Sequence, residues 1–229
     1  MYTLHYAPDN ASLILRLVML DAGLPFTTQL VDRATRQQDS SAYRALNPTG
    51  LIPTLVTPAG PISETAACLL WLSEAHPAAG FAPAPGHRDR ISFLRWLFFL
   101  SNTAHADLRQ IFYPDQYVGR EGLNSHLAKL TSRMIRHFTL LDQAAQTHPS
   151  LFTAPCVLAY YTATLMRWPM LYPKDAQRWF KITDFPALHA MAKTLDNRPA
   201  TLAAAAAEGL GPTPFTHPHH ARPPEGSAV

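Results

Sequence analysis

The character of the sequence changes near residue 76, and this change constrains the fold more than any other feature. Before it, short strand-like runs such as Leu4 to Tyr6 and Pro53 to Val56 alternate with helix-like segments in the order β-α-β-α-β-β-α. After it, strand signals vanish and only helices are expected. These helices are expected at about 88–108, 121–147 and 155–170, with shorter ones at about 173–180, 186–195 and 199–208.

Proline and glycine mark the boundaries between these parts. The stretch from His76 to Gly86 is rich in both residues, which is typical of a linker. We therefore expect a mixed α/β domain over residues 1–77, a linker over 78–87 and an all-helical domain over 88–210. The tail over 211–229 carries several prolines and histidines without periodicity, so it is expected to be disordered.

Composition and charge exclude several classes of function. The 19 basic and 16 acidic residues give a net charge of +3, which is too mild to indicate a nucleic-acid partner. No apolar run approaches the roughly 18 residues needed to span a bilayer, so no membrane partner is expected. The 2 cysteines and the lack of a secretory leader predict a cytoplasmic protein. The histidines of the tail lack preorganised partners, so no metal site is expected.

Two contiguous stretches carry a resemblance to a known family. Residues 47–55 read Asn-Pro-Thr-Gly-Leu-Ile-Pro-Thr-Leu, and residues 62–67 read Ile-Ser-Glu-Thr-Ala-Ala. At this spacing they resemble stretches of the cytosolic glutathione transferase superfamily, and residues 185–188 and 198–200 resemble the end of its helical domain. The resemblance covers about residues 1–210. It implies an α/β plus all-α protein, in which a thioredoxin-like glutathione-binding domain precedes an all-helical domain with the substrate pocket.

The same resemblance implies a glutathione site on the first domain. The family's proline is cis, which implies that Ile52 and Pro53 turn a free main-chain edge toward the cysteinyl part of glutathione. Thr65, at a helix N-terminus, is implied to hold the γ-glutamyl carboxylate, and Glu64 the γ-glutamyl amine. The alternative is that these two residues only cap the helix. Gln38 lies where the family often contacts the glycine end.

The residue that would stabilise the glutathione thiolate stays open. Residues 6–13 read Tyr-Ala-Pro-Asp-Asn-Ala-Ser-Leu and resemble the bacterial (beta-like) pattern Y-S-P-G-A-C-S-L, with Ala11 in place of the cysteine. Ser12 is the first substitute, although a serine there is also a natural helix cap. Asn10 would donate through its amide unless it is only a turn residue. Tyr6 would donate through its hydroxyl unless it is packed in the core.

Four further candidates lie in the helical part. His105 belongs to a segment that resembles the fourth helix of the bacterial type, whose histidine faces the active-site cleft, and an imidazole can act near neutral pH. The alternative is an ordinary surface or core histidine. Tyr113, Tyr117 and Trp168 are candidate aromatic walls for an apolar second substrate, although aromatic residues at helical spacing are more often core.

The helix expected to begin near residue 155 lacks the family's usual cap. That helix normally starts with S/T-x-x-D, but Cys156 and Ala159 occupy the two places here. Losing such a cap typically costs about 0.5–2 kcal/mol. We expect Thr153 to cap the helix instead, with Pro155 as its first residue.

Together these features favour a glutathione transferase-like enzyme that adds glutathione, its cosubstrate, to a small apolar electrophile. Two alternatives remain. One is a glutathione-dependent isomerase or lyase of specialised metabolism. The other is a non-catalytic binding or scaffolding protein that has the fold without the thiol chemistry. The family is commonly dimeric, so a homodimer is the expected assembly.

Overall fold

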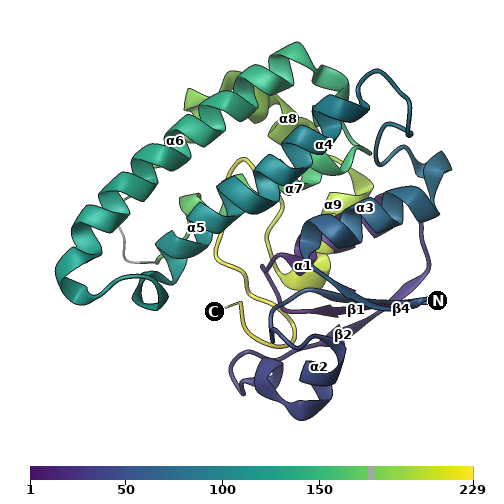
Figure 1. Ribbon diagram of the computed structural model, residues 1–229, viewed down its shortest axis with the longest axis horizontal. Coiled ribbons are helices and arrows are strands. Elements are labelled where there is room, and N and C mark those ends of the chain that lie inside the picture. The colour runs from purple at the N-terminus through teal and green to yellow at the C-terminus, as the bar shows by residue number, and fades with distance from the viewer. Residues whose placement is uncertain (175–177, 229) are drawn as a thin grey trace.

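The computed structural model describes residues 1–174 and 178–228, and its first part is a mixed four-stranded sheet with helices on both faces. The strand order is β2-β1-β3-β4; β1 pairs with β2 in parallel, and the other two pairs are antiparallel. Helices α1 and α3 cover one face and α2 the other (Figure 1). The bounds are β1 Tyr2–Tyr6, α1 Ser12–Asp21, β2 Phe26–Leu30, α2 Ser41–Leu46, β3 Thr54–Thr57, β4 Gly60–Ser63 and α3 Thr65–Ala75. This confirms the expected thioredoxin-like arrangement.

Burial explains why the sequence forms these elements. In β1, Tyr2, Leu4 and Tyr6 are buried while the residues between them are partly exposed, as alternation predicts for a strand. Helix α1 is apolar on nearly all sides because it packs against β1, α3, α7 and α9. It therefore joins the sheet to the helices that follow, and it places the loop after β1 between the two halves.

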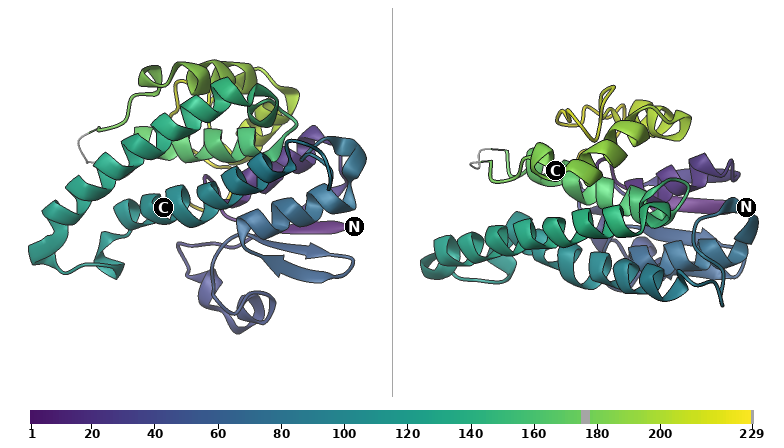
Figure 2. Two further views of the ribbon diagram at one scale, coloured as in Figure 1. Left: turned by 45° about the horizontal axis from the view of Figure 1, so that its top comes forward. Right: turned by 90° about the horizontal axis from the view of Figure 1, so that it is seen from above.

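Beyond α3 the described residues form helices and no strand, which confirms the all-helical character of this part. Helices α4 and α5 are joined by a π-helical turn over residues 100–104 into one continuous run. The bounds are α4 Arg90–Phe99, α5 His105–Phe112, α6 Leu123–Thr147, α7 Val157–Arg167, α8 Pro186–Asp196 and α9 Pro199–Glu208. Figure 2 shows that α5 and α6 extend as an arm beyond the sheet.

The helix expected over 173–180 falls in part on residues 175–177, which lie outside the described residues. Among the helices that the structure does describe, none is both long and apolar enough to cross a bilayer.

Helix α7 is the centre of the helical half, and its start differs from the expectation. Every residue of α7 is buried. Thr153 does not cap it, because the Thr153 hydroxyl donates to the carbonyl of Pro149 at 2.9 Å. The helix begins at Val157, whose N–H donates to the carbonyl of Phe81 at 2.9 Å. An acceptor from the segment before α4 thus replaces the missing side-chain cap.

The expectation of disorder beyond residue 210 is wrong for residues 211–228. Phe215 is fully buried, and its N–H and that of Thr216 donate to the Asp196 carboxylate. Arg167 donates to the carbonyls of Pro214 and His219 at 3.0 and 2.9 Å. The segment then runs back toward the sheet, as its yellow trace shows (Figure 1). The prolines prevent regular hydrogen bonding within this segment, so it shows no periodicity in the sequence. Its main-chain groups are hydrogen-bonded by the buried side chains of Arg167 on α7 and Asp196 on α8.

Candidate functional site

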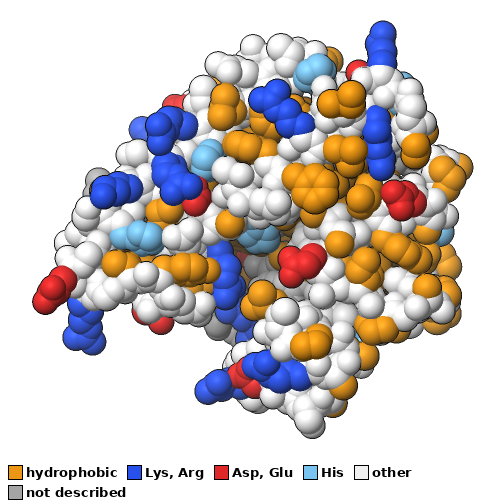
Figure 3. Space-filling view, in the orientation of Figure 1, with side chains coloured by type: hydrophobic (Ala, Val, Ile, Leu, Met, Phe, Trp, Pro, Cys, Tyr) orange, Lys and Arg blue, Asp and Glu red, His pale blue; other side chains and the backbone are white. Residues whose placement is uncertain are grey.

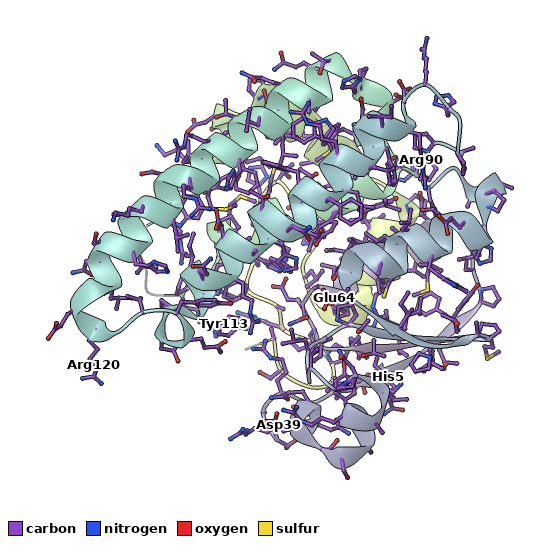
Figure 4. All side chains as sticks on the ribbon, viewed as in Figure 1. His5, Asp39, Glu64, Arg90, Tyr113 and Arg120 are labelled. Carbon is purple, nitrogen blue, oxygen red and sulfur yellow. The ribbon has the colours of Figure 1, made fainter. Side chains whose placement is uncertain are left out.

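A cleft of about 1100 Å³ lies between the α/β half and the helical half. One wall is formed by the loop after β1, the segment before β3 and the start of α3. The other wall is formed by the run from α4 to α5 and by the end of α7. Figure 3 shows the hollow beside the α2 region, and Figure 4 shows Glu64 and Tyr113 on either side of it.

The segment before β3 presents an unpaired main chain to the cleft. The Ile52–Pro53 peptide bond is cis, and both residues line the cleft. The hydroxyl of Tyr43 and the amide of Asn47 each donate to the carbonyl of Leu51 at 2.7 Å, which holds the segment in place. Among the described residues, the main-chain N–H and C=O of Ile52 form no hydrogen bond. Such an edge can pair with an extended peptide.

The N-terminus of α3 opens into the same cleft. Glu64 precedes it with φ 67°, a left-handed conformation that is rare for a non-glycine residue and is found mostly at functional sites. No side chain of the described residues caps the helix, and Thr65, Ala66 and Ala67 line the cleft. The first amide groups and the helix dipole therefore favour an anion there. The exposed Glu64 carboxylate forms no ion pair among the described residues and also lines the cleft.

The loop after β1 brings Asn10 and Ala11, but not Ser12, into the cleft. Ser12 is fully buried, where its hydroxyl donates to the Ala7 carbonyl at 3.0 Å and accepts from the Ala7 N–H at 3.3 Å. The structure thus places the first candidate for thiolate stabilisation away from the ligand space, because its side chain closes the loop instead. Asn10 turns Oδ1 to the N–H of Ala11 at 2.8 Å, which leaves its Nδ2 group as a donor beside the start of α1.

The α/β half is similar in sequence to known proteins. Residues 11–75 match the family model of the glutathione S-transferase N-terminal domain. Glutathione S-transferase GST-4.5 of Xanthomonas campestris pv. campestris is 29% identical over 120 residues, which is 52% of this chain and 58% of that protein. Glutathione S-transferase GstA of Escherichia coli O157:H7 is 26% identical over 114 residues, 49% of this chain and 57% of that protein. The chain thus spans under two thirds of the length of these curated relatives.

Solved structures extend the likeness to most of the chain. A sphingomonad glutathione S-transferase complexed with glutathione is 27% identical with a TM-score of 0.72, over 88% of this chain and 96% of that one. The chain therefore resembles glutathione S-transferases in the sequence of its α/β half and in its fold over most of its length. A glutathione transferase homologue from Sulfitobacter, with bound glutathione, has the same fold at 20% identity, with a TM-score of 0.76 over 89% and 96%.

Within this glutathione transferase fold, Tyr6 does not face the cleft. Its ring is buried, with the Arg16 guanidinium 4.5 Å from the ring centre. Its hydroxyl donates to the carboxylate of Glu225 in the C-terminal segment. Burial and then Glu225 raise the pKa of Tyr6 above its ordinary value, so the hydroxyl keeps its proton. Its role is to hold the C-terminal segment against β1.

A buried charge network supports the loop after β1, and sequence reasoning missed it. Asp9 has φ 49°, and its carboxylate accepts from Arg167 at 2.8 and 2.9 Å, from Trp168 Nε1 at 3.0 Å and from the Tyr172 hydroxyl at 2.9 Å. The Asp9 N–H donates to Glu208 at 2.9 Å. Asp9 looks like a turn aspartate in the sequence. Its partner Arg167 is 158 residues away, so no local pattern predicts the pair.

Glu208 completes this network from the end of α9. Its carboxylate is fully buried and also accepts from Arg16 Nε at 2.7 Å. Burial raises the pKa of Glu208 to about 7, while Arg16 opposes this shift. The network therefore ties the loop beside the cleft to α1, α7 and α9.

The other candidates divide between the cleft and its outside. His105 lines the cleft, and its Nδ1 lies 3.0 Å from the Tyr161 hydroxyl. Burial and then Arg109 lower the pKa of His105 to about 4, so the imidazole is neutral at pH 7. Tyr113, Trp168 and Gln38 also line the cleft.

Tyr117 does not line the cleft. It is half-exposed, and its hydroxyl accepts from Arg109 Nε at 3.1 Å. The expectation that Tyr117 forms a wall of the pocket is therefore wrong. The short 3₁₀ turn over Pro114–Gln116 separates it from α5 and ends the helical spacing on which that expectation depended.

Proposed function

We propose that the protein binds glutathione in this cleft and transfers it to a small electrophile. One observation carries the proposal: the uncapped N-terminus of α3 and the unpaired main chain of Ile52 border the same space. The γ-glutamyl carboxylate of glutathione binds the first amides of α3 and the Thr65 hydroxyl. Glu64 accepts from the γ-glutamyl amine. The cysteinyl main chain pairs with Ile52, and the amide of Gln38, whose Oε1 is buried without a partner among the described residues, meets the glycyl end.

In this arrangement Asn10 is the donor to the sulfur. A thiol with a pKa near 8.5 is mostly protonated at pH 7, and an N–H donor beside a helix N-terminus lowers that pKa. Asn10 meets both conditions, since it precedes α1 and lines the cleft. The sulfur then attacks the electrophile without a covalent bond to the protein, because Ala11 offers no thiol. Neutral His105 faces the reacting groups as a hydrogen-bonding residue without a charge of its own.

Calorimetric titration of glutathione tests the proposal. We expect a Kd between about micromolar and low millimolar. Replacing Thr65→Ala should weaken binding about tenfold or more, because a hydrogen bond to a charged group contributes about 1.5–3 kcal/mol. S-hexylglutathione should bind more tightly than glutathione by occupying the adjoining apolar wall.

The control is Thr139→Ala, because the Thr139 hydroxyl donates to the carbonyl of Ile135 on α6 and Thr139 does not line the cleft. Its affinity for glutathione should equal that of the wild type. If no heat of binding is detected at several millimolar glutathione, the proposal is refuted. The alternative of a non-catalytic scaffolding protein would then be favoured.

We propose a homodimer as the assembly. Helix α4 exposes Ile91 by 82% at a position outside the cleft, whereas Phe98 of the same helix lines the cleft. A second copy would cover Ile91. Light scattering should give a mass of two chains for the wild type and of one chain for Ile91→Glu. A monomeric wild type at micromolar concentration would contradict this assembly.

A further inference from the structure

The outer part of the cleft carries positive charges without acidic partners. Arg33, Arg109 and Lys174 line it, and none of them forms an ion pair among the described residues. Arg109 donates to the Tyr117 hydroxyl at 3.1 Å and to the Gln116 amide oxygen at 3.1 Å. The hydrogen-bond partners of Arg109 in the described part of the chain are therefore both neutral.

Among the described residues, the acids that line the cleft form no ion pair with these cations. Asp9 forms an ion pair with Arg167, and Asp39 forms ion pairs with Arg36 and Arg44 at 2.8 Å each. Glu64 lies at the other end, beside α3, where it serves the γ-glutamyl amine under the proposed function. A ligand that complements the outer part of the cleft must therefore bring negative charge of its own.

Arg33 and Arg109 are placed differently. Arg33 reaches across the mouth of the cleft, where it donates to the Tyr113 hydroxyl at 2.7 Å and to the Ala228 carbonyl at 3.0 Å. Arg109 lies on α5 itself, four residues after His105 and on the same face. Its charge contributes to the low pKa of His105, which agrees with this proximity.

His105 and Arg109 lie one helical turn apart on the side of α5 that lines the cleft. Four residues of helix span about 6 Å, which suits a benzene ring with substituents at opposite ends. Aromatic side chains border the same space, with the Trp168 ring centre 5.5 Å from that of His105 and 6.4 Å from that of Phe112. These rings pack against one another and form a single aromatic wall, on which a flat ring can stack.

We propose that the second substrate is an aromatic electrophile that carries a carboxylate, with Arg109 as its specificity-determining anchor and Lys174 as an additional cation. The proposal rests on the proposed function and refines it, because the sequence alone predicts an apolar electrophile. The reacting carbon lies beside His105 and the glutathione sulfur. The carboxylate lies one helical turn further along α5.

A pair of matched probes tests this at equilibrium. S-(4-carboxybenzyl)glutathione and S-(4-carbamoylbenzyl)glutathione differ only in charge at the end of the ring. Calorimetry on the wild type should give at least about tenfold tighter binding of the carboxylate, as expected for a charged hydrogen bond. In Arg109→Gln the ratio of the two affinities should fall to near one, and Arg109→Lys should restore part of it. Added salt should reduce the wild-type ratio.

The control is Arg95→Gln. Arg95 lies on α4, stacks 4.9 Å from the Trp96 ring centre and does not line the cleft, so its removal should keep the wild-type ratio. Thermal unfolding of each variant shows whether it folds. If Arg109→Gln does not fold, the proposal is tested instead by the ratio of the two conjugate affinities in Arg109→Lys and in Lys174→Gln. The salt dependence of the wild-type ratio is the additional measurement.

Turnover gives a second readout. With 4-chloro-3-nitrobenzoate, the glutathione thiolate forms a carbon–sulfur bond at the carbon that bears chlorine, chloride leaves with the bonding pair, and the thiol proton passes to the buffer. The rate enhancement is the enzymatic rate divided by the uncatalysed rate. For 4-chloro-3-nitrobenzoate it should be about tenfold larger than for 4-chloro-3-nitrobenzamide.

The outcomes separate the two proposals. If glutathione binds and the wild type binds the carboxylate and carbamoyl conjugates equally, the anionic substrate is refuted and the proposed function stands. If Arg109→Gln weakens glutathione itself about tenfold, Arg109 serves glutathione and the assignment is wrong. If neither glutathione nor its conjugates bind, the proposed function fails, and this inference fails with it.

Discussion

At the scale of single residues, the loop after β1 assigns opposite tasks to two neighbours. The Ser12 hydroxyl is hydrogen-bonded to the Ala7 main chain, whereas Asn10 lines the cleft and its Nδ2 group has no partner among residues 1–174 and 178–228. The sequence favours serine because serine is the usual cap and a common thiolate donor. It cannot show that the loop folds back far enough for Ser12 to bind residue 7.

The two residues should therefore differ in their effect on bound glutathione. Asn10→Ala should raise the pKa of the bound thiol by about 1–2 units, because it removes a hydrogen bond to the thiolate. Ser12→Ala should leave that pKa unchanged and lower the free energy of unfolding by about 1–3 kcal/mol. Ultraviolet absorbance of the thiolate across pH, together with urea unfolding, measures both. The reverse pattern would restore Ser12 as the donor.

His105 gives a pH dependence with a definite sign. Its pKa is about 4 in the folded protein against 6.5 for the free side chain, so the unfolded chain binds more protons between these values. Stability from neutral His105 is complete above pH 6.5 and is lost as the pH falls toward 4. Urea unfolding at pH 7 and pH 5 should show about 1–2 kcal/mol less loss in His105→Gln than in the wild type.

The matched control for this titration is His87→Gln. His87 lies on the surface, with its side chain half-exposed beside Asp89. This variant should follow the wild-type pH dependence. An equal loss in His105→Gln and the wild type would mean that His105 is not held neutral by the fold.

At the scale of elements, the sequence predicts what depends on neighbours along the chain. Alternation predicts β1, and apolar helical spacing predicts α1 and α3, within a few residues of their bounds. The start of α7 could not be predicted, because its acceptor is the carbonyl of Phe81, far earlier in the chain. The C-terminal segment escapes prediction for the same reason, since its hydrogen bonds go to side chains of other elements.

Packing of that segment can be tested at Phe215, which is fully buried. Phe215→Ala should lower the free energy of unfolding by about 3–5 kcal/mol, as for other buried phenylalanines. Pro224→Ala, at an exposed position of the same segment, should change it by less than about 0.5 kcal/mol. Chemical denaturation measures both. If neither substitution changes the free energy of unfolding, residues 211–228 are not packed against the rest of the protein, and the expectation of disorder is restored.

At the scale of the whole molecule, the α/β side of the cleft could be predicted but the network that supports it could not. Ile52, Glu64 and Thr65 lie within short contiguous motifs, so their resemblance is visible in the sequence. Asp9 meets Arg167 and Glu208 only after both halves have folded together. The sequence shows that Arg33, Arg109 and Lys174 are basic. Only the fold shows that they line the cleft and form no ion pair among the described residues.

Asp9 joins the two halves, so its loss should affect the whole protein. Asp9→Asn removes the charge that faces the buried Arg167, and an unpaired buried charge costs about 3–5 kcal/mol. Asp39→Asn is the control, because its ion pairs lie at the surface and should contribute little. Urea unfolding followed by circular dichroism compares them. A cost for Asp9→Asn no larger than that of Asp39→Asn would contradict the role of the network.

The C-terminal segment has a consequence for the order of events during translation. The ribosome makes the sheet, the cleft walls and α7 before it makes the residues whose carbonyls bind Arg167. A nascent chain can therefore fold both halves while the guanidinium that holds Asp9 still lacks two of its partners. The loop beside the cleft gains this support only when residues 214–219 have left the ribosome, and Glu225 and Ala228, which hold Tyr6 and Arg33, follow later still.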